Sequence, residues 1–373
     1  MEFPVDNVEK VRYTIYNIKW RVEFFSPRGV EVLAMKKAQR LEAEKFLLRC
    51  IYDEDKDFVE HTMEKYGISK STVYNYLTTL QNNGEVERVG GSMPYRVLYD
   101  TTRFTVDTTR ESSEDRMFSR DIAPLLEELP LNVQRIWRYA FTAMMNNAME
   151  HAHASAIVCV VSRNRLCTII GILDNGVGIF RRIQQERKES TGELPTAAEA
   201  AALLYPGGYT SEPDSHAGEG IFFTSRLMDH FVIRSDAQLF TPNEADAEDE
   251  GGERFRGTAV QMALNNDSTR ELSEVMNRYL DPEAGFARTE LPLARFIGGD
   301  FPVSRSEARR LLAVLEHFRE AELDFAGIQD VGRDFAHELF TVAAGQYPTL
   351  LLHVKNANAS VAGALRRAGY TQC

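Results

Sequence analysis

The sequence predicts a multidomain protein of mixed α+β and α/β class. Three observations lead to this prediction: helical spacing followed by a short β-hairpin over 41–99, helices and strands joined by glycine-rich loops over 126–270, and a regular strand–helix alternation over 290–373. A chain of 373 residues is long enough for two or three domains of ordinary size. We therefore divide it into an N-terminal domain at 1–100, a polar connector at 101–125, a central domain at 126–270 and a C-terminal domain at 271–373.

The composition predicts a globular protein of the reducing cytoplasm. Hydrophobic residues make up 43% and charged residues 26% of the chain, and no apolar run approaches the roughly 20 residues that cross a membrane. The start, MEFPVDNVEK, lacks the features of a secretory signal. The cysteines Cys50, Cys159, Cys167 and Cys373 show no metal or disulfide spacing. A net charge of −12 argues against a chain coated in nucleic acid, but one small DNA-binding module is compatible with it.

The sequence of the N-terminal domain predicts a winged helix-turn-helix. Residues 1–40 alternate polar and apolar side chains around a turn, which is typical of a β-hairpin. Apolar residues then recur at helical spacing over 41–52, 58–66 and 71–82, and Gly67 fits a helix C-cap before a tight turn. A second hairpin follows over 85–99. Three helices, a short turn before the third and a hairpin after it are the order of elements in a winged helix.

The third helix of this domain is the candidate DNA-reading element. The residues expected to face the major groove are Lys70, Ser71, Thr72, Tyr74 and Asn75, and Arg88 or Arg96 would lie on the wing. The domain is close to neutral, however, and this helix carries one lysine. Docking to a protein is therefore the alternative to DNA binding.

In the central domain, residues 133–153 predict a helix packed on a sheet, because apolar side chains recur on one face. An adjacent strip carries Ala143, Asn147, Glu150 and His151 at spacings of three or four residues, so these side chains converge. Amide, carboxylate and imidazole groups in one strip indicate a polar ligand. Taken alone, an asparagine pair in a helix can also be structural.

A carboxylate and two glycines follow a pair of strands predicted at 156–162 and 166–173. Asp174 ends the second strand, and Gly176 and Gly178 come directly after it. The aspartate can accept a hydrogen bond from an exocyclic amine, and the glycines let the backbone approach a ligand closely. A tight turn is the structural alternative, because DNG is also a good turn sequence.

Two further glycine-rich segments lie at 207–211 and 216–221, and the second leads into a helix. Such a loop presents backbone N–H groups and the positive end of the helix dipole to phosphate. The candidate ligand residues in this region are Thr210, Ser211, Gly218, Glu219 and Gly220. A strand at 256–260 adds Thr258, whose hydroxyl can reach back to a base. The acidic stretch 241–254 has little to bury and predicts a mobile loop.

These four segments, in this order and spacing, resemble the N-box, G1 box, G2 lid and closing Gly-Thr strand of the GHKL superfamily. The resemblance covers about 126–270 and implies the Bergerat α/β sandwich with bound ATP and Mg²⁺. It implies that Asn147 holds the cation and that Asp174 reads the adenine amino group, with Thr258 helping through water. By the same resemblance, Gly176 and Gly178 shape the adenine pocket. Gly218 and Gly220 cradle the phosphates under a lid at about 203–220.

One position departs from the resemblance. Hydrolytic members carry a general-base glutamate four residues before the cation-binding asparagine, where this sequence has Ala143. Loss of a positioned base costs about 10²–10⁴-fold in rate. The stretch FTAMMNNA otherwise resembles the family pattern FTEMLNNA, which favours an engineered Glu→Ala change; a natural ATP-binding switch with little hydrolysis is the alternative. Glu150 and His151 are close enough to consider as substitute bases but poorly placed for the γ-phosphate.

The C-terminal domain predicts a small α/β layer of order βαβαβα. Strands are expected at 291–296, 323–328 and 349–354, and helices after the Ser304–Glu307 capping box and at 331–344 and 360–368. The stretch DFAGIQDVGRDFAHELF resembles the STAS-like domain that some bacterial GHKL proteins carry. Signalling STAS domains have a phosphorylated serine here, whereas this chain reads Gln329-Asp330-Val331-Gly332. Docking to the ATP domain or to a partner protein is therefore the expected role.

Three functions are compatible with these features. The first is an ATP-controlled conformational switch that links the winged helix and the STAS-like domain, in bacterial regulation or defence. The second is an active ATPase in its native form, and the third is an anti-sigma-type Ser/Thr protein kinase. The resemblance also implies that the ATP-bound form dimerises. No membrane partner is expected.

Overall fold

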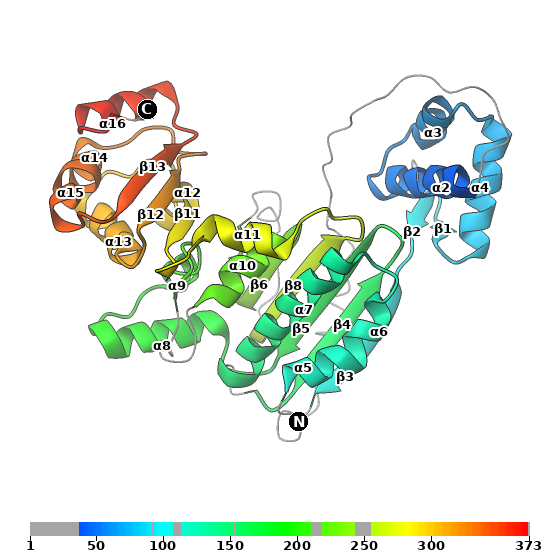
Figure 1. Ribbon diagram of the computed structural model, residues 1–373, viewed down its shortest axis with the longest axis horizontal. Helices are drawn as coiled ribbons and strands as arrows, with labels where there is room; N and C mark the ends of the chain where they lie inside the picture. Colours follow the sequence, from blue (N-terminus) through cyan, green and yellow to red (C-terminus); the bar gives the residue numbers. More distant parts are fainter. Residues whose placement is uncertain are drawn as a thin grey trace.

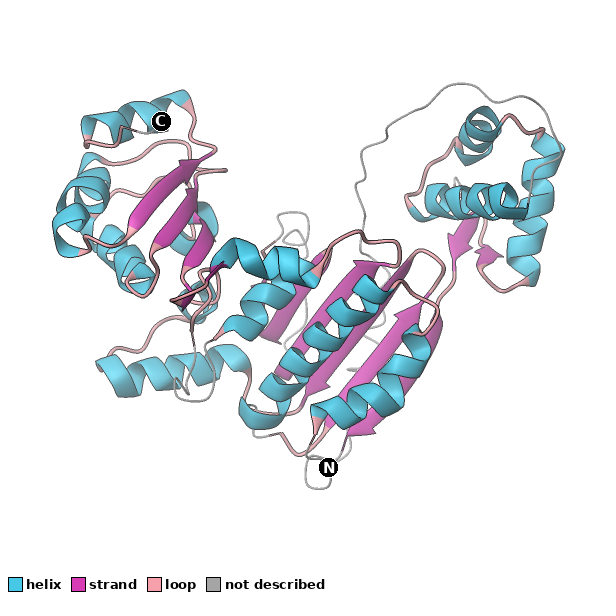
Figure 2. Ribbon diagram, in the orientation of Figure 1, coloured by secondary structure: helices cyan, strands magenta, loops and turns pink. Residues whose placement is uncertain are grey.

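The computed structural model describes residues 37–91, 93–106, 113–151, 154–209, 218–242 and 255–371. These residues form three modules of mixed α and β structure: an N-terminal helical module, a central sheet covered by helices, and a C-terminal α/β module (Figures 1 and 2). Most of the hairpin expected over 1–40 and most of the acidic loop expected over 241–254 lie outside the described residues. No helix among the described residues is long and apolar enough to span a membrane.

The helical module contains the three predicted helices and the hairpin. Its elements are α2 (Lys37–Tyr52), α3 (Phe58–Tyr66), α4 (Lys70–Asn82), β1 (Val86–Arg88) and β2 (Tyr95–Val97). Gly67 closes α3 in the left-handed conformation, with φ of 63°, as the sequence predicts. The Ser69 side chain caps α4 by accepting a hydrogen bond from the Thr72 backbone amide at 3.2 Å. Apolar faces of all three helices meet in one core.

The central module is a six-stranded antiparallel sheet in the order β3-β4-β5-β8-β6-β7. Its strands are β3 (Asp100–Val106), β4 (Ile157–Arg163), β5 (Cys167–Asp174), β6 (His230–Asp236), β7 (Gln238–Phe240) and β8 (Phe255–Asn265). The packed helices are α5 (Glu114–Met117), α6 (Ala123–Leu126), α7 (Leu131–Asn146), α8 (Ile179–Thr191), α9 (Ala197–Ala202), α10 (Glu219–Leu227) and α11 (Leu272–Tyr279). Figure 1 shows α7 lying along the face of the sheet, and its Trp137 and Phe141 are fully buried there.

Two sequence predictions for this module need correction. The expected connector at 101–125 contains β3, which pairs with β4, and the short helices α5 and α6. The β3 strand is polar because it lies at the edge of the sheet, where most of its side chains are exposed or half-buried. The expected helix at 133–153 is regular only to Asn146, and a wider π-helical turn, Asn147–His151, follows.

The C-terminal module is a three-stranded parallel sheet in the order β11-β12-β13 with helices around it. Its strands are β11 (Arg288–Pro292), β12 (Glu320–Asp324) and β13 (Leu351–Lys355), preceded by the hairpin β9 (Leu280–Asp281) and β10 (Gly285–Phe286). Its helical segments are α12 (Leu293–Ile297), α13 (Arg305–Leu315), α14 (Arg333–His337), η4 (Glu338–Val342), α15 (Ala343–Gln346) and α16 (Ala359–Arg367). The predicted capping box is confirmed, since Ser304 and Glu307 bond each other's backbone amides.

Two strand predictions in this module are displaced. The strand expected at 291–296 ends at Pro292, and 293–297 form α12. The strand expected at 323–328 ends at Asp324, because the Asp324 carboxylate accepts a hydrogen bond from the Ala326 amide at 2.9 Å and starts a turn. Gly327, with φ of 79°, continues that turn.

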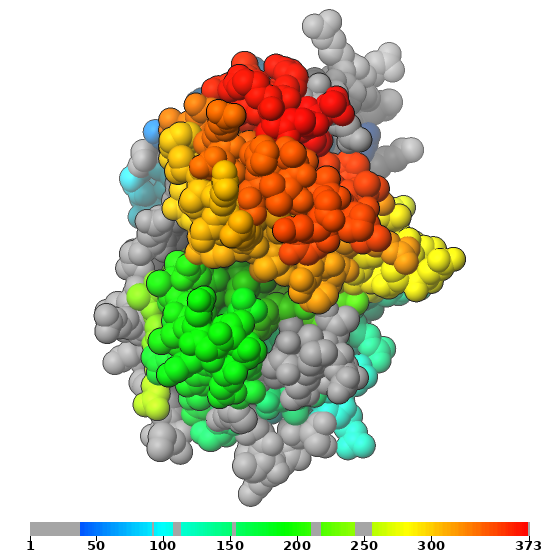
Figure 3. All heavy atoms as spheres, turned by 90° about the vertical axis from the view of Figure 1, so that its left-hand side faces the viewer, coloured from blue at the N-terminus to red at the C-terminus, as the bar shows by residue number. Residues whose placement is uncertain are grey.

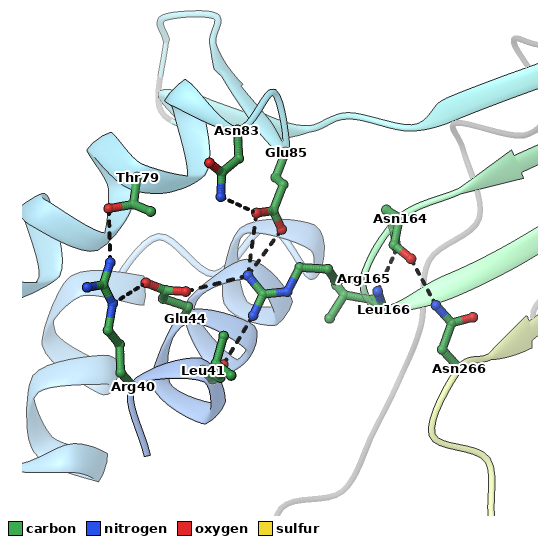
Figure 4. Close-up of polar contacts among 10 residues, drawn as sticks. All are labelled: Arg40, Leu41, Glu44, Thr79, Asn83, Glu85, Asn164, Arg165, Leu166 and Asn266. Carbon is green, nitrogen blue, oxygen red and sulfur yellow. Dashed lines mark hydrogen bonds and ion pairs between the residues drawn. The ribbon is translucent and has the colours of Figure 1, made fainter. Parts of the chain in front are cut away.

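The turn between β4 and β5 joins the central sheet to the helical module (Figure 4). Arg165 lies between two acids of the helical module, with its Nη1 atom 3.1 Å from Glu85 Oε2 and 3.6 Å from Glu44 Oε2. The next residue, Leu166, has 0% of its surface exposed and belongs to the apolar core of the helical module. The central module therefore contributes both a cation and a core side chain to its neighbour.

Candidate functional site

A cavity of about 370 Å³ lies between the helices and the sheet of the central module. It brings together residues from all four segments that the sequence singles out. The predicted site residues that line it are Ala143, Asn147, Glu150, Asp174, Gly178, Gly218, Glu219, Gly220 and Thr258. Part of its wall is apolar, formed by Met144, Ile172, Ile179, Ile183, Ile233 and Val260. Such a cavity suits a ligand with a flat apolar ring and a few polar groups.

Asp174 places a buried acceptor in this cavity. It is the last residue of β5 and only 2% exposed. Its Oδ1 atom accepts hydrogen bonds from the backbone amides of Gly176 at 2.8 Å and Thr258 at 3.2 Å. Burial raises the pKa of this carboxyl from 3.8 to about 6, and these hydrogen bonds oppose the rise. Gly176 thus acts through Asp174, since it is absent from the residues that line the cavity.

Two glycines allow the strands to close around Asp174. Gly178, with φ of 89°, begins α8, and a Cβ atom there would lie 2.4 Å from Ser235 Oγ. Gly257, with φ of 97°, lies in β8, and a Cβ atom there would lie 2.1 Å from the Asp174 carbonyl oxygen. The neighbouring Thr258 hydroxyl accepts a hydrogen bond from the Ile179 amide at 3.0 Å. Thr258 therefore holds the start of α8 beside Asp174.

The described residues on either side of 210–217 form another side of the cavity. Gly218, with φ of 66°, is the N-cap of α10, and a Cβ atom there would lie 2.5 Å from the Tyr209 carbonyl oxygen. The Gly208 amide donates to the Gly218 carbonyl at 3.2 Å. The ends of the loop are thus held together, and the first residues of α10 line the cavity. Thr210 and Ser211 lie outside the described residues, as does the side chain of His151.

The end of α7 faces the start of α10 across the cavity. Ala143 and Asn147 lie one helical turn apart, and both line the cavity. A Cβ atom on Gly220 would lie 3.4 Å from Ala143 Cβ, so the two helices approach closely at this point. Tyr139 lines the same wall, and burial together with the Glu219 charge raises the pKa of its hydroxyl. At this point of the wall, Ala143 presents a methyl group to the cavity.

The rim of the cavity is acidic. Its lining carboxylates besides Asp174 are Glu114, Asp115, Glu150, Glu186 and Glu219. The basic residue among the lining side chains is Arg182, which is paired with Glu186. Burial raises the pKa of Glu219. A polyphosphate would therefore need cations of its own to enter this site.

Several of these residues were not predicted as site residues. Glu114 and Asp115 fall in the expected connector, and Arg182 and Glu186 on a helix without a motif. Tyr139 could have been found, because it precedes Ala143 by one helical turn on the same face. Among the described residues, no group of three or more His, Cys, Asp or Glu side chains is arranged to hold a metal ion. A cation at Asn147 would therefore depend on oxygens from its ligand.

In the helical module, most of the predicted DNA-facing residues are exposed. Lys70, Ser71, Tyr74, Asn75 and Arg88 are exposed, whereas Thr72 is half-buried beside the Ser69 cap. Lys70 Nζ lies 3.9 Å from Glu60 Oε1, and Arg96 on β2 is paired with Glu87. Arg88 on β1 is therefore the exposed arginine of the β1–β2 hairpin that is better placed for a partner.

Comparison with known proteins identifies part of the C-terminal module. A profile of the STAS-like domain of unknown function (DUF4325) matches residues 307–362. The match spans α13 to α16 and includes β12 and β13. A search of curated proteins finds no match to the chain. Residues 307–362, the larger part of the C-terminal module, thus match a STAS-like domain.

Proposed function

We propose that the central module binds ATP with Mg²⁺ and acts as an ATP-controlled conformational switch. The observation that carries this proposal is the convergence of Asn147, Asp174, Gly218 and Thr258 on one cavity from four separate segments of the chain. Each segment alone is compatible with a structural role. Their convergence on a single cavity is what a ligand site requires.

The adenine end of the ligand would lie against Asp174. A buried carboxylate that is ionised at neutral pH accepts a hydrogen bond from an exocyclic amine, and the apolar wall supports a flat ring. The cavity volume of about 370 Å³ falls within the usual range for small-molecule sites of about 300–1,000 Å³. A guanine base would present a carbonyl oxygen to Asp174 in place of the amine, which favours adenine.

The phosphate end would lie between the start of α10 and Asn147. Backbone N–H groups at a helix N-terminus bind phosphate oxygens, and the amide oxygen of Asn147 suits Mg²⁺. The acidic rim repels a bare polyphosphate, so Mg²⁺ is expected to be obligatory for tight binding. In this chemistry the cation neutralises the phosphates, while the residues of the chain bind and orient the nucleotide.

Turnover is expected to be slow. Ala143 can neither accept a proton nor orient water, because its side chain is a methyl group. We therefore assign ATP binding, rather than hydrolysis or phosphotransfer, as the functional event. ATP bound at the start of α10 would change the contacts of that helix, and the neighbouring modules would respond.

A titration with a fluorescent ATP analogue tests this proposal. Asn147→Ala should weaken binding about ten- to hundred-fold, since it removes a polar ligand of a charged group, and chelation of Mg²⁺ should weaken wild-type binding comparably. Asn82→Ala, at the exposed end of α4, is the matched control and should bind as wild type does. Unchanged affinity after both Asn147→Ala and Mg²⁺ removal would show that the proposed site is wrong.

The helical module is proposed as the output element, with DNA as its first candidate partner. The supporting observation is the exposed polar face of α4 beside the exposed Arg88. A gel shift with genomic fragments, comparing wild type with the Lys70→Ala/Arg88→Ala double variant, tests this assignment. Binding that depends on salt and on these two cations supports DNA. Absent or salt-insensitive binding would assign the module to protein docking.

A further inference from the structure

An aromatic cluster joins the cavity to the STAS-like domain. Phe222 and Phe223 of α10 are almost fully buried and face the C-terminal module. The Phe222 ring centroid lies 4.9 Å from those of Phe286 and Tyr279, and the Phe223 centroid lies 5.2 Å from that of Phe286. Phe286 also packs edge-on against Phe318 at 5.1 Å. Phe222 lines the cavity as well, so one ring separates the cavity from the C-terminal module.

The cavity wall at Gly207 and Gly208 is pressed against the same cluster. A Cβ atom on Gly207 would lie 2.8 Å from the Phe286 ring and 2.9 Å from Phe222 Cβ, and one on Gly208 would lie 3.3 Å from the Phe318 ring. Gly207 itself lines the cavity. The backbone of this wall can therefore move only if the rings move with it.

Polar contacts also hold the central and C-terminal modules together beside the aromatic cluster. The buried Thr289 hydroxyl on β11 donates to the Pro206 carbonyl at 2.5 Å. Arg226 of α10 donates to the Glu290 carbonyl at 3.1 Å, and the Glu290 carboxylate is bonded by Lys355 of β13 at 2.9 Å. The orange part of the C-terminal module also lies against the green segment in Figure 3, where Arg310 of α13 is bonded to Glu199 of α9. Both the wall and the helix of the cavity are thus tied to the parallel sheet.

We infer that Phe222 and Phe286 couple nucleotide occupancy of the cavity to the STAS-like domain. This inference rests on the proposed ATP site, and it identifies the side chains through which that site would affect the C-terminal module. Gly218 and Gly220, at the start of α10, lie within about one turn of Phe222, so phosphate bound at the start of the helix would act directly on the Phe222 ring. Phe286 is a positioning residue in this scheme, since it holds the Gly207 wall from outside the cavity.

Hydrogen–deuterium exchange combined with nucleotide titration tests the coupling. In wild type, the Mg²⁺-bound ATP analogue should slow exchange in peptides over 286–292 and 318–324, which do not line the cavity. Phe286→Ala should remove this remote protection and, because coupling is reciprocal, weaken nucleotide affinity about five-fold or more. Thr289→Val keeps the side-chain shape while removing the hydrogen bond to Pro206, and should reduce the remote protection.

Phe340→Ala is the matched control, because Phe340 packs against Tyr370 at 4.8 Å within the same domain and away from the junction. It should keep both wild-type affinity and remote protection. Nucleotide bound by wild type without protection at 286–292 and 318–324 would overturn the coupling while leaving the ATP site intact. Remote protection unchanged in Thr289→Val and Phe286→Ala would overturn it as well. Absence of nucleotide binding by wild type would reject the ATP site itself, and the coupling with it.

Discussion

The buried carboxylate of Asp174 is expected to lower the free energy of unfolding of the protein while providing a hydrogen-bond acceptor for the ligand. In the ligand-free protein its pKa is raised from 3.8 to about 6, so the folded state holds the proton more tightly than the unfolded state does. The free energy of unfolding should therefore fall as pH rises from about 4 to 6. At 1.36 kcal/mol per pH unit, the ionised carboxylate destabilises the fold by about 3 kcal/mol above pH 6.

The substitution Asp174→Asn removes this charge with little change in shape. Relative to wild type, it should raise the free energy of unfolding by about 3 kcal/mol at pH 7.5 and only about 1 kcal/mol at pH 4.5, where the folded wild type is protonated. Urea unfolding at the two pH values measures the difference, and the other titrating groups of the chain cancel between the two proteins. Equal effects at both pH values, or a loss of stability at pH 7.5, would refute the reasoning.

The same substitution should act in the opposite direction on the nucleotide. The Asp174 Oδ1 atom already accepts two backbone amides, so an asparagine would keep its oxygen there and turn its amide nitrogen toward the base. Two donors would then face each other, and affinity for a fluorescent ATP analogue should fall at least about ten-fold. Weak binding combined with a more stable fold cannot be explained by misfolding.

Three further substitutions test other parts of the structure. Ala143→Glu should raise phosphate release by about 10²–10⁴-fold in a steady-state assay if nucleotide is bound as proposed, whereas Ala143→Gln, which cannot take up a proton, should not. Gly257→Ala should lower the free energy of unfolding, measured in urea, by about 1–3 kcal/mol more than Gly192→Ala does. Both glycines have positive φ, but only at Gly257 would the added Cβ atom clash with backbone, namely the Asp174 carbonyl oxygen. Equal losses of stability in the two variants would contradict the predicted clash. Arg165→Met removes the cation that Glu44 and Glu85 share. The helical module should then be held less firmly against the central sheet, and X-ray scattering should give a larger radius of gyration. An unchanged radius would show that the apolar contacts alone hold the two modules together.

Local signals in the sequence locate many elements well. The helix at 58–66, the Gly67 cap and the Ser304–Glu307 capping box depend on residues within one or two turns, and all are found where predicted. The strand expected at 323–328 ends at Asp324, because the Asp324 side chain accepts a hydrogen bond from the Ala326 amide and starts a turn there. Periodicity alone does not contain that hydrogen bond.

Long-range pairing sets the limit for the sheet and for the candidate site. The role of β3 depends on its register with β4, where Thr101 pairs with Ser162, and its polar pattern by itself resembles a linker. Glu114 and Asp115 reach the cavity because α5, which carries them, packs against α7. Motifs predicted many of the residues that line the cavity, whereas the acidic residues Glu114, Asp115 and Glu186 of its lining required the three-dimensional structure.

Leu166 shows that the boundary between two modules is not a boundary between two cores. Its side chain completes the apolar interior of a unit that otherwise ends more than sixty residues earlier in the chain, at Val97. If the chain were cut near residue 100, the N-terminal fragment would have a cavity in its core in place of the Leu166 side chain, and the C-terminal fragment would expose Leu166 to solvent. Motion of the β4–β5 turn would be felt inside the helical module as a change in its packing. A signal from the sheet could thus reach that module through its interior, without any change at its surface.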